Sequence, residues 1–213
     1  MTDRPPFSPL RIVVLISGGG TTLRNLIEQR DAATLDVDIC KVISSNPRAG
    51  GLQIASHHGI PATTVDRSRY GDVETFSQDL FDACRGVDPH LIVMGGFLKL
   101  VEIPDDFHLR VMNIHPALIP AFCGRGHYGL RVHQAALEYG VKLSGCTVHF
   151  VDQKYDHGPI ILQRCVPVLD DDTPERLAKR VFAAECQAYP EALRLFAAGR
   201  LKVENRHVTI RSG

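Results

Sequence analysis

The sequence predicts an α/β fold in which a mostly parallel sheet carries helices on both faces and continues into an antiparallel C-terminal part. Short apolar runs of β type alternate with helix-type segments through the first half of the chain. After Gly140, two long β-rich segments follow each other across one short loop, which suits antiparallel neighbours. A long helical segment and a small hairpin come last.

The alternation in the first half predicts the parallel part of the sheet. Arg11–Ser17 is an apolar run typical of a buried strand, and a glycine turn separates it from an amphipathic stretch. Gly59 is a stop signal for the second helix. We expect strands at Arg11–Ser17, Val37–Ser44, Ala62–Val65, His90–Gly96 and Leu109–Ile114, and helices at Thr21–Ala33, Ala49–His58 and Asp72–Arg85.

The second half predicts two antiparallel strands, Lys142–Val151 and Pro159–Leu169. A helix then begins at Thr173, which offers an N-cap and is followed by a proline and an acidic residue in the first turn. We expect this helix to run to the stop at Gly199, with a possible bend at Pro190. Two short β-type runs, Leu201–Val203 and His207–Ile210, predict a terminal hairpin.

The domain organisation predicted from these elements is simple. Residues 1–10 contain tandem prolines and no apolar run, which predicts a disordered or extended N-terminal tail. The sequence has no repeats, low-complexity segment or linker, so residues 11–213 are expected to form a single domain.

The composition is that of an ordinary soluble protein, with 44% apolar and 23% charged residues and a formal net charge of zero. No broad basic field is present, which argues against nucleic acid or an anionic membrane as partner. No apolar run approaches the roughly 20 residues that a membrane span needs. The six cysteines have no C-x-x-C spacing, so we expect reduced thiols and a cytoplasmic protein rather than disulfides or a zinc site.

The segment Ser17-Gly18-Gly19-Gly20-Thr21-Thr22 separates the first strand from the first helix. Glycines let the backbone approach an anion, and the start of a helix offers free N–H groups. A dinucleotide fingerprint would need glycine or alanine at Leu23, and no G-K-[ST] follows. A plain glycine turn remains the alternative, but the segment favours a single phosphate monoester.

Asn113 and His115 form a polar pair at the end of an apolar segment, immediately before Pro116. Residues two apart on a strand point to the same face, and the proline keeps His115 out of helical geometry. Open α/β sheets place active sites at such strand ends. An amide beside an imidazole, with Asp156 available elsewhere, could stabilise an oxyanion and move a proton. The alternative is structural, with the pair satisfying backbone groups and Asp156 serving a turn before Gly158.

Two further residues leave their role open at this stage. Thr147 and His149 alternate along the strand Cys146–Val151, so they could face the same cleft as the polar pair or simply pack.

Three motifs, taken together, resemble the folate-dependent formyltransferases. They are N-x-H-P-x-L-[IL]-P at 113–120, S-G-C-T-V-H-F-V at 144–151 with Asp156 five residues later, and G-P-I-I-L-Q at 158–163. The similarity runs from about Arg11 to about Val203. It implies a Rossmann-like formyltransferase fold. It is closest to the branch of the family that transfers the formyl group of 10-formyltetrahydrofolate to the amine of glycinamide ribonucleotide in purine synthesis.

The resemblance also implies the residues of the site. Asn113 and protonated His115 would stabilise the tetrahedral oxyanion, while Asp156 would support His115 and help to shuttle a proton. The ribonucleotide would contact Gly20, Thr21, Thr22 and Glu185. The folate would contact Leu98, Lys99, Leu100, Val101, Asn113, Asp152 and Asp156. The formyl-folate would be a co-substrate, no metal would be needed, and a homodimer is possible.

The chain departs from the family pattern at several positions. The folate loop often reads F-M-R-I-L, and here it reads F-L-K-L-V at 97–101. Phe182 and Cys186 stand where the family often has Lys or Gln and His, which changes the side chains expected to reach the phosphate. The glycine-rich stretch Phe122–His133 is longer than the shortest family form, and we interpret it as a mobile flap over the cleft.

Three alternatives remain open beside this interpretation. A 10-formyltetrahydrofolate hydrolase would use a similar trio with water as acceptor, but the glycine loop would have no obvious role. Methionyl-tRNA formyltransferase would require a basic surface and a tRNA-binding domain. A non-catalytic folate- or nucleotide-binding module would not need the set Asn113, His115 and Asp156.

Overall fold

The computed structural model describes residues 6–212 and contains nine strands, five α-helices and two short 3₁₀ helices within that range. The chain forms two compact units. Unit 1 comprises Met1–Met112 and Ala197–Gly199, and unit 2 comprises Asn113–Phe196 and Arg200–Gly213. Strand β5 (Val111–His115) contains the boundary, so its last three residues belong to unit 2.

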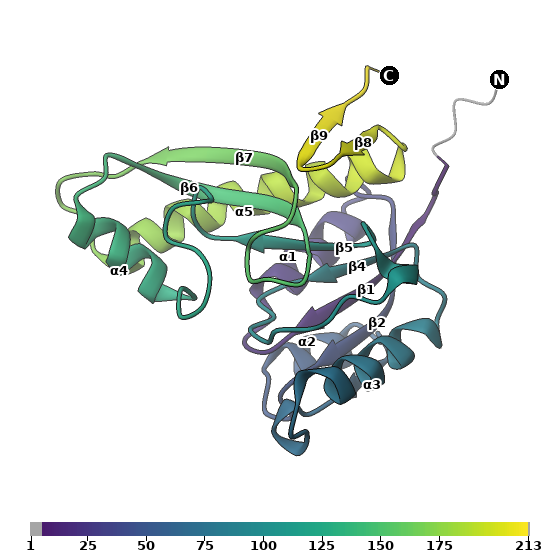
Figure 1. Cartoon of the computed structure of the whole chain (residues 1–213). Coiled ribbons are helices and arrows are strands. Elements are labelled where there is room, and N and C mark those ends of the chain that lie inside the picture. The colour runs from purple at the N-terminus through teal and green to yellow at the C-terminus, as the bar shows by residue number, and fades with distance from the viewer. Residues whose placement is uncertain (1–5, 213) are drawn as a thin grey trace. The chain divides into compact units, whose positions relative to one another are not determined.

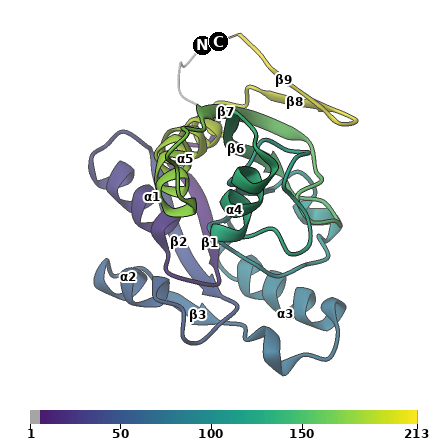
Figure 2. The same cartoon turned by 90° about the vertical axis from the view of Figure 1, so that its left-hand side faces the viewer.

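Unit 1 contains a parallel sheet with the strand order β3-β2-β1-β4 (Figure 1). Leu10 and the five residues Ile12 to Ile16 of β1 are fully buried, because a central parallel strand has both faces covered. Helices α1 and α3 lie on opposite sides of these strands (Figure 2). The elements are β1 (Leu10–Ile16), α1 (Thr21–Asp31), β2 (Val37–Ser44), α2 (Gly51–His57), β3 (Ala62–Thr64), α3 (Val73–Arg85) and β4 (Leu91–Met94), with 3₁₀ helices at Arg67–Arg69 and Asp105–Phe107.

Helix α3 illustrates how the sequence specifies these elements. The Asp72 carboxylate accepts a hydrogen bond from the Thr75 N–H over 2.8 Å and so caps the helix. Phe76, Leu80 and Cys84 recur at helical spacing and are fully buried, which gives the helix one apolar face.

Unit 2 contains the antiparallel part of the fold. Strand β6 (Leu143–Phe150) pairs antiparallel with β7 (Ile160–Pro167), and β7 pairs parallel with β9 (His207–Ile210). Strand β8 (Leu201–Glu204) completes an antiparallel hairpin with β9. Figure 1 shows this hairpin in yellow beside β7. The helices are α4 (Leu130–Tyr139) and α5 (Pro174–Ala197).

The predicted fold class is confirmed, with parallel pairs in unit 1 and the predicted antiparallel pair and hairpin in unit 2. Pro190 lies inside α5, as expected for one long helix. Helix α4 was not predicted, and it takes up the last four residues, Leu130 to His133, of the stretch interpreted as a flap.

The predicted tail over residues 1–10 lies partly outside the described residues. At its described end, Leu10 already begins β1. The single domain over residues 11–213 stays a prediction. No helix in the described part of the chain is both long and apolar enough to cross a membrane.

Candidate active site

The last residues of β5 present a polar pair within unit 2. Asn113 is half-buried and His115 is 4% exposed, while Ile114 between them is buried on the other side of the strand. Nε2 of His115 lies 2.9 Å from the carbonyl oxygen of Phe122 and donates to it. Nδ1 of the same ring lies 3.5 Å from Oδ2 of Asp156. His115 is therefore held between a backbone acceptor and a carboxylate.

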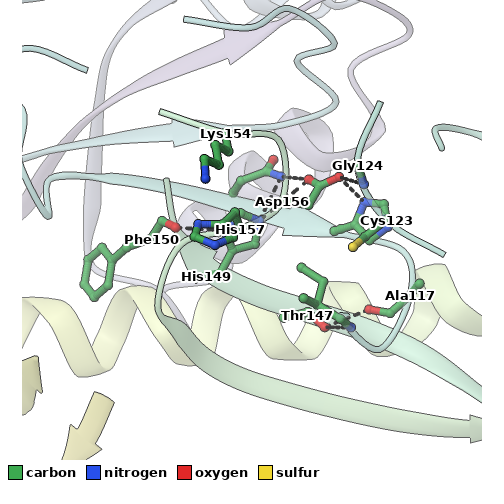
Figure 3. Close-up of polar contacts among 12 residues, drawn as sticks. Ala117, Cys123, Gly124, Thr147, His149, Phe150, Lys154, Asp156 and His157 are labelled. Carbon is green, nitrogen blue, oxygen red and sulfur yellow. Dashed lines mark hydrogen bonds and ion pairs between the residues drawn. The ribbon is translucent and has the colours of Figure 1, made fainter. Parts of the chain in front are cut away.

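Asp156 lies at the centre of the site, with its side chain only 11% exposed. Its Oδ2 accepts a hydrogen bond from the Gly124 N–H over 2.9 Å, which Figure 3 shows. Its Oδ1 accepts a longer bond, 3.4 Å, from Nδ2 of Asn113. The structure thus brings together Asn113, His115 and Asp156, the three residues predicted as catalytic. Asp156 comes from a segment that is distant in the sequence from the strand that carries the other two residues.

His149 joins this cluster and resolves one alternative that the sequence left open. Its Nδ1 donates to the carbonyl oxygen of Phe150 over 2.8 Å (Figure 3), which leaves Nε2 as an acceptor. Nε2 lies 3.3 Å from Nδ2 of Asn113 and 3.8 Å from Oδ1 of Asp156. Burial lowers the pKa of His149, so the ring is the neutral partner that orients the Asn113 amide.

Thr147 has a structural role. Its hydroxyl is fully buried and donates to the carbonyl oxygen of Ala117 over 2.7 Å (Figure 3). It also accepts from the N–H of Ile119 over 3.1 Å and from Nε2 of Gln163 over 3.0 Å. These bonds fix the segment that follows His115, so Thr147 holds the pair in place rather than facing a substrate.

The backbone at Asp156 has an unusual conformation, with φ at 49° in the left-handed region. Two residues later, a side chain on Gly158 would bring its Cβ within 1.9 Å of the carbonyl oxygen of Phe150. Glycine is therefore required at that position for the segment to return against β6. Strained backbone conformations of this kind recur at functional sites.

The loop after His115 contacts both ionisable groups. Phe122 has φ at 49°, and its carbonyl accepts from His115, while Gly124 donates to Asp156. Between them, Cys123 has a thiol whose pKa is raised, first by burial and then by the charge of Asp156. A raised pKa keeps this thiol protonated, so Cys123 is not an activated nucleophile.

His133 on α4 was missed by the sequence analysis because α4 itself was not predicted. The residue is 4% exposed, and its Nδ1 has no hydrogen-bond partner within the described residues. Burial lowers the pKa of His133 to about 4, with the charge of His115 as a smaller cause. The signal that could have located it is the helical periodicity between Gly129 and Gly140.

The predicted phosphate segment belongs to unit 1. Gly20 has φ at 78°, and a side chain there would bring its Cβ within 2.6 Å of the Cα of Gly51. The Gly51 N–H donates to the carbonyl oxygen of Gly18 over 3.1 Å, which closes the turn. No side chain caps the start of α1, and its first turn contains no acidic residue. The N–H groups of Thr21 and Thr22 are thus suited to an anion.

The segment predicted to meet the folate is also in unit 1. The Leu98 N–H donates to the Ser17 hydroxyl over 3.0 Å, and the Leu98 side chain is 45% exposed. Lys99 is exposed, Leu100 is half-buried and Val101 is buried in the core of the unit. Leu98 and Lys99 therefore present side chains outward, whereas Val101 contributes packing.

The remaining predicted residues lie in unit 2. Asp152 accepts from the Lys154 N–H over 2.9 Å and from Nδ1 of His157 over 2.6 Å, so its carboxylate already has two partners. Glu185 lies on α5, and burial raises the pKa of its carboxyl to about 7. Within the described residues, no group of three or more His, Cys, Asp or Glu side chains could hold a metal ion.

The sequence and the fold of this chain are similar to those of known proteins. The formyl transferase family matches residues 10–193. The chain is 37% identical over 193 residues to the chloroplastic phosphoribosylglycinamide formyltransferase of Vigna unguiculata, which covers 90% of this chain and 62% of that relative. The chain thus spans less than two thirds of that relative's length.

Two solved structures are similar over nearly their whole length. Glycinamide ribonucleotide transformylase 1 from Symbiobacterium toebii is 40% identical with a TM-score of 0.89, covering 100% of this chain and 96% of its own. The phosphoribosylglycinamide formyltransferase of Coxiella burnetii is 37% identical with a TM-score of 0.87, and the match covers 95% of this chain and 93% of the other chain.

Proposed function

The chain belongs to the formyl transferase family and, within it, to the phosphoribosylglycinamide formyltransferases, and we propose that it transfers a formyl group from 10-formyltetrahydrofolate to the amine of glycinamide ribonucleotide. This is a step of purine biosynthesis. The observation that carries the proposal is the contact of Asp156 with both Asn113 and His115. An amide, an imidazole and a carboxylate in contact are the groups that acyl transfer to an amine requires.

The reaction builds charge on the formyl oxygen. Attack of the amine on the formyl carbon gives a tetrahedral oxyanion, which hydrogen-bond donors stabilise. When the oxyanion collapses, the bond between the formyl carbon and N10 of the folate breaks, and tetrahydrofolate leaves with a proton on N10 that balances the one lost by the amine. The two hydrogen bonds from Nδ2 of Asn113, at 3.3 and 3.4 Å, are near the long limit, so the oxyanion can take over one of them. Protonated His115 supplies the second donor in this proposal.

Asp156 accepts the proton of the attacking amine in this mechanism. The attacking amine must lose a proton as the carbon–nitrogen bond forms, and a carboxylate can accept it directly or through water. The position of Oδ2 3.5 Å from Nδ1 of His115 supports a second role, stabilising the imidazolium charge. No step requires a metal ion or a covalent intermediate, and the formyl-folate acts as a co-substrate.

The loop after His115 has a place in this mechanism. The Phe122 carbonyl accepts a hydrogen bond from Nε2 of His115, and the Gly124 N–H donates one to Oδ2 of Asp156. Movement of the loop would free both catalytic groups at once. This supports the interpretation of the stretch from Phe122 as a flap, now limited to the residues before α4.

The two substrates have separate binding residues in this proposal. Gly20, Thr21 and Thr22 bind the phosphate of the ribonucleotide through the start of α1, and Glu185 accepts hydrogen bonds from the ribose. Leu98, Lys99, Leu100, Val101 and Asp152 contact the folate, together with Asn113 and Asp156. In this proposal, residues 98–101 contact the folate through their backbone, so their side chains can vary. This is consistent with the sequence F-L-K-L-V at 97–101, where the family often has F-M-R-I-L.

Other properties stay predictions. A homodimer and a cytoplasmic location are proposed, the latter from six scattered cysteines that form no disulfide. The relative from Vigna unguiculata is chloroplastic.

The test is to incubate the chain with 10-formyltetrahydrofolate, with and without glycinamide ribonucleotide, and to follow tetrahydrofolate release. Release that depends on the ribonucleotide supports the transferase. Release at the same rate without it would instead indicate a 10-formyltetrahydrofolate hydrolase. No release in either mixture would favour a binding module.

A further inference from the structure

The hairpin β8–β9 contacts the segment that carries Asp156. Strand β9 begins at His207, which pairs with Ile160 at the start of β7. Arg206 precedes His207 in the turn of the hairpin, and its Nη2 donates to the carbonyl oxygen of His157 over 2.6 Å. The hairpin therefore holds the backbone at the residue that directly follows Asp156.

The same guanidinium also contacts the ring of His157. Nη1 of Arg206 lies 3.1 Å from Nε2, and Nδ1 of the ring lies 2.6 Å from Oδ2 of Asp152. In these contacts Nδ1 of the ring donates to the carboxylate, and Nε2 accepts from the guanidinium. Oδ1 of Asp152 accepts from the Lys154 N–H over 2.9 Å. Arg206, His157 and Asp152 thus form one connected network across the segment.

The segment needs such support because its geometry is unfavourable in isolation. Asp156 has φ at 49°, which residues with a side chain rarely adopt. The base of the segment is fixed by the Phe150 N–H, which donates to the carbonyl oxygen of Pro159 over 2.9 Å, and by the close approach of Gly158 to Phe150. Arg206 adds a second anchor on the C-terminal side of Asp156.

We infer that Arg206 is a positioning residue for the formyl transfer, acting through His157 to hold Asp156 at His115 and Asn113. This inference rests on the proposed function. The contacts of Asp156 with its partners range from 2.9 to 3.8 Å, so a small shift of its backbone breaks them. Arg206 itself is exposed and touches none of the proposed reacting groups.

The test compares three variants of the full chain. Arg206→Ala removes the contacts of the guanidinium with the ring and with the carbonyl oxygen of His157, and Arg206→Lys retains a donor for the carbonyl. Lys202→Ala is the matched control, because Lys202 lies on the same hairpin and its side chain pairs only with the exposed Glu204 among the contacts described. Hydrogen exchange of the amides at 153–158, kcat, and ribonucleotide affinity are measured for each, with urea unfolding as a check on global stability.

In Arg206→Ala we expect faster exchange at 153–158 and a kcat lowered by up to about a hundredfold, with ribonucleotide affinity and the unfolding midpoint unchanged. Arg206→Lys should recover part of the protection from exchange and part of kcat, and Lys202→Ala should match wild type in both. Unchanged exchange or unchanged kcat in Arg206→Ala would overturn the inference, as would an equal loss in Lys202→Ala. A wild-type chain that transfers no formyl group would refute the proposed function instead, and exchange would still show whether Arg206 holds the segment.

Discussion

Nε2 of His149 accepts a hydrogen bond from Nδ2 of Asn113 across 3.3 Å, and this contact sets the direction of the amide. Because Nδ1 of His149 donates to the Phe150 carbonyl, the ring cannot rotate without losing a buried hydrogen bond. The amide nitrogen of Asn113 is thereby kept on the side of Asp156. His149, which is not among the residues proposed to bind a substrate, thus determines which atom of the Asn113 amide faces Asp156.

The first prediction concerns His149. His149→Ala removes the acceptor for the amide, so kcat should fall about tenfold or more while ribonucleotide affinity is retained. His108→Ala, at an exposed histidine in unit 1, is the control and should behave as wild type. Steady-state kinetics check both variants. Normal kcat in His149→Ala would show that the amide needs no such support.

The second prediction concerns the oxyanion. Asn113→Ala and His115→Ala each remove one proposed donor, and each should lower kcat by about 10²–10³-fold. The ribonucleotide affinity should stay near the wild-type value, because the phosphate residues are untouched. Calorimetric titration measures that affinity, and initial rates measure kcat. A loss of affinity with unchanged kcat would move both residues from catalysis to binding.

The third prediction concerns the phosphate. Gly20→Ala places a Cβ within 2.6 Å of the Gly51 Cα at a residue with φ of 78°, so the turn must shift and the ribonucleotide KM should rise. Gly19→Ala is a matched control one residue away, since a Cβ there meets nothing within 4 Å. Equal KM values in the two variants would argue against a phosphate site formed by the backbone at Gly20.

The fourth prediction concerns Glu185. Burial raises the pKa of its carboxyl from 4.5 to about 7, so between these values the folded chain keeps a proton that the unfolded chain has lost. The contribution of Glu185 to stability therefore falls as the pH rises through this window. Glu185→Gln removes the ionisable carboxyl and with it this dependence of stability on pH. The variant should be more stable than wild type at pH 8 but not at pH 4.

Urea unfolding at a series of pH values checks this result. Glu28→Gln, at an exposed carboxylate on α1, should show no difference from wild type across the same window. A pH profile of Glu185→Gln that parallels wild type would mean that the carboxyl is not desolvated.

Most of the fold could be predicted because its elements follow local patterns. The apolar run of β1 and the capped, periodic α3 each carry a complete local signal, and both were found at nearly the observed bounds. Helix α4 was missed because the glycines at 124, 126 and 129 suggested a loop. Its buried face consists of Val132, His133 and Ala136, a weak apolar stripe.

The site was predictable only in part. Asn113 and His115 share a strand, so their common face follows from strand geometry alone. The contacts of Asp156 and His149 with them depend on how β6 and β7 bring distant segments together, which local periodicity does not encode. The support from Arg206 has no sequence signal at all, since an arginine in a hairpin turn is usually solvated.

The most direct test of the central claim follows the formyl carbon itself. The chain is mixed with glycinamide ribonucleotide and 10-formyltetrahydrofolate labelled with ¹³C in the formyl group, and the reaction is monitored by NMR. We predict that the label moves to an amide on the ribonucleotide, at a rate that Asn113→Ala and His115→Ala reduce. Appearance of the label as free formate, with the ribonucleotide unchanged, would contradict the proposed function.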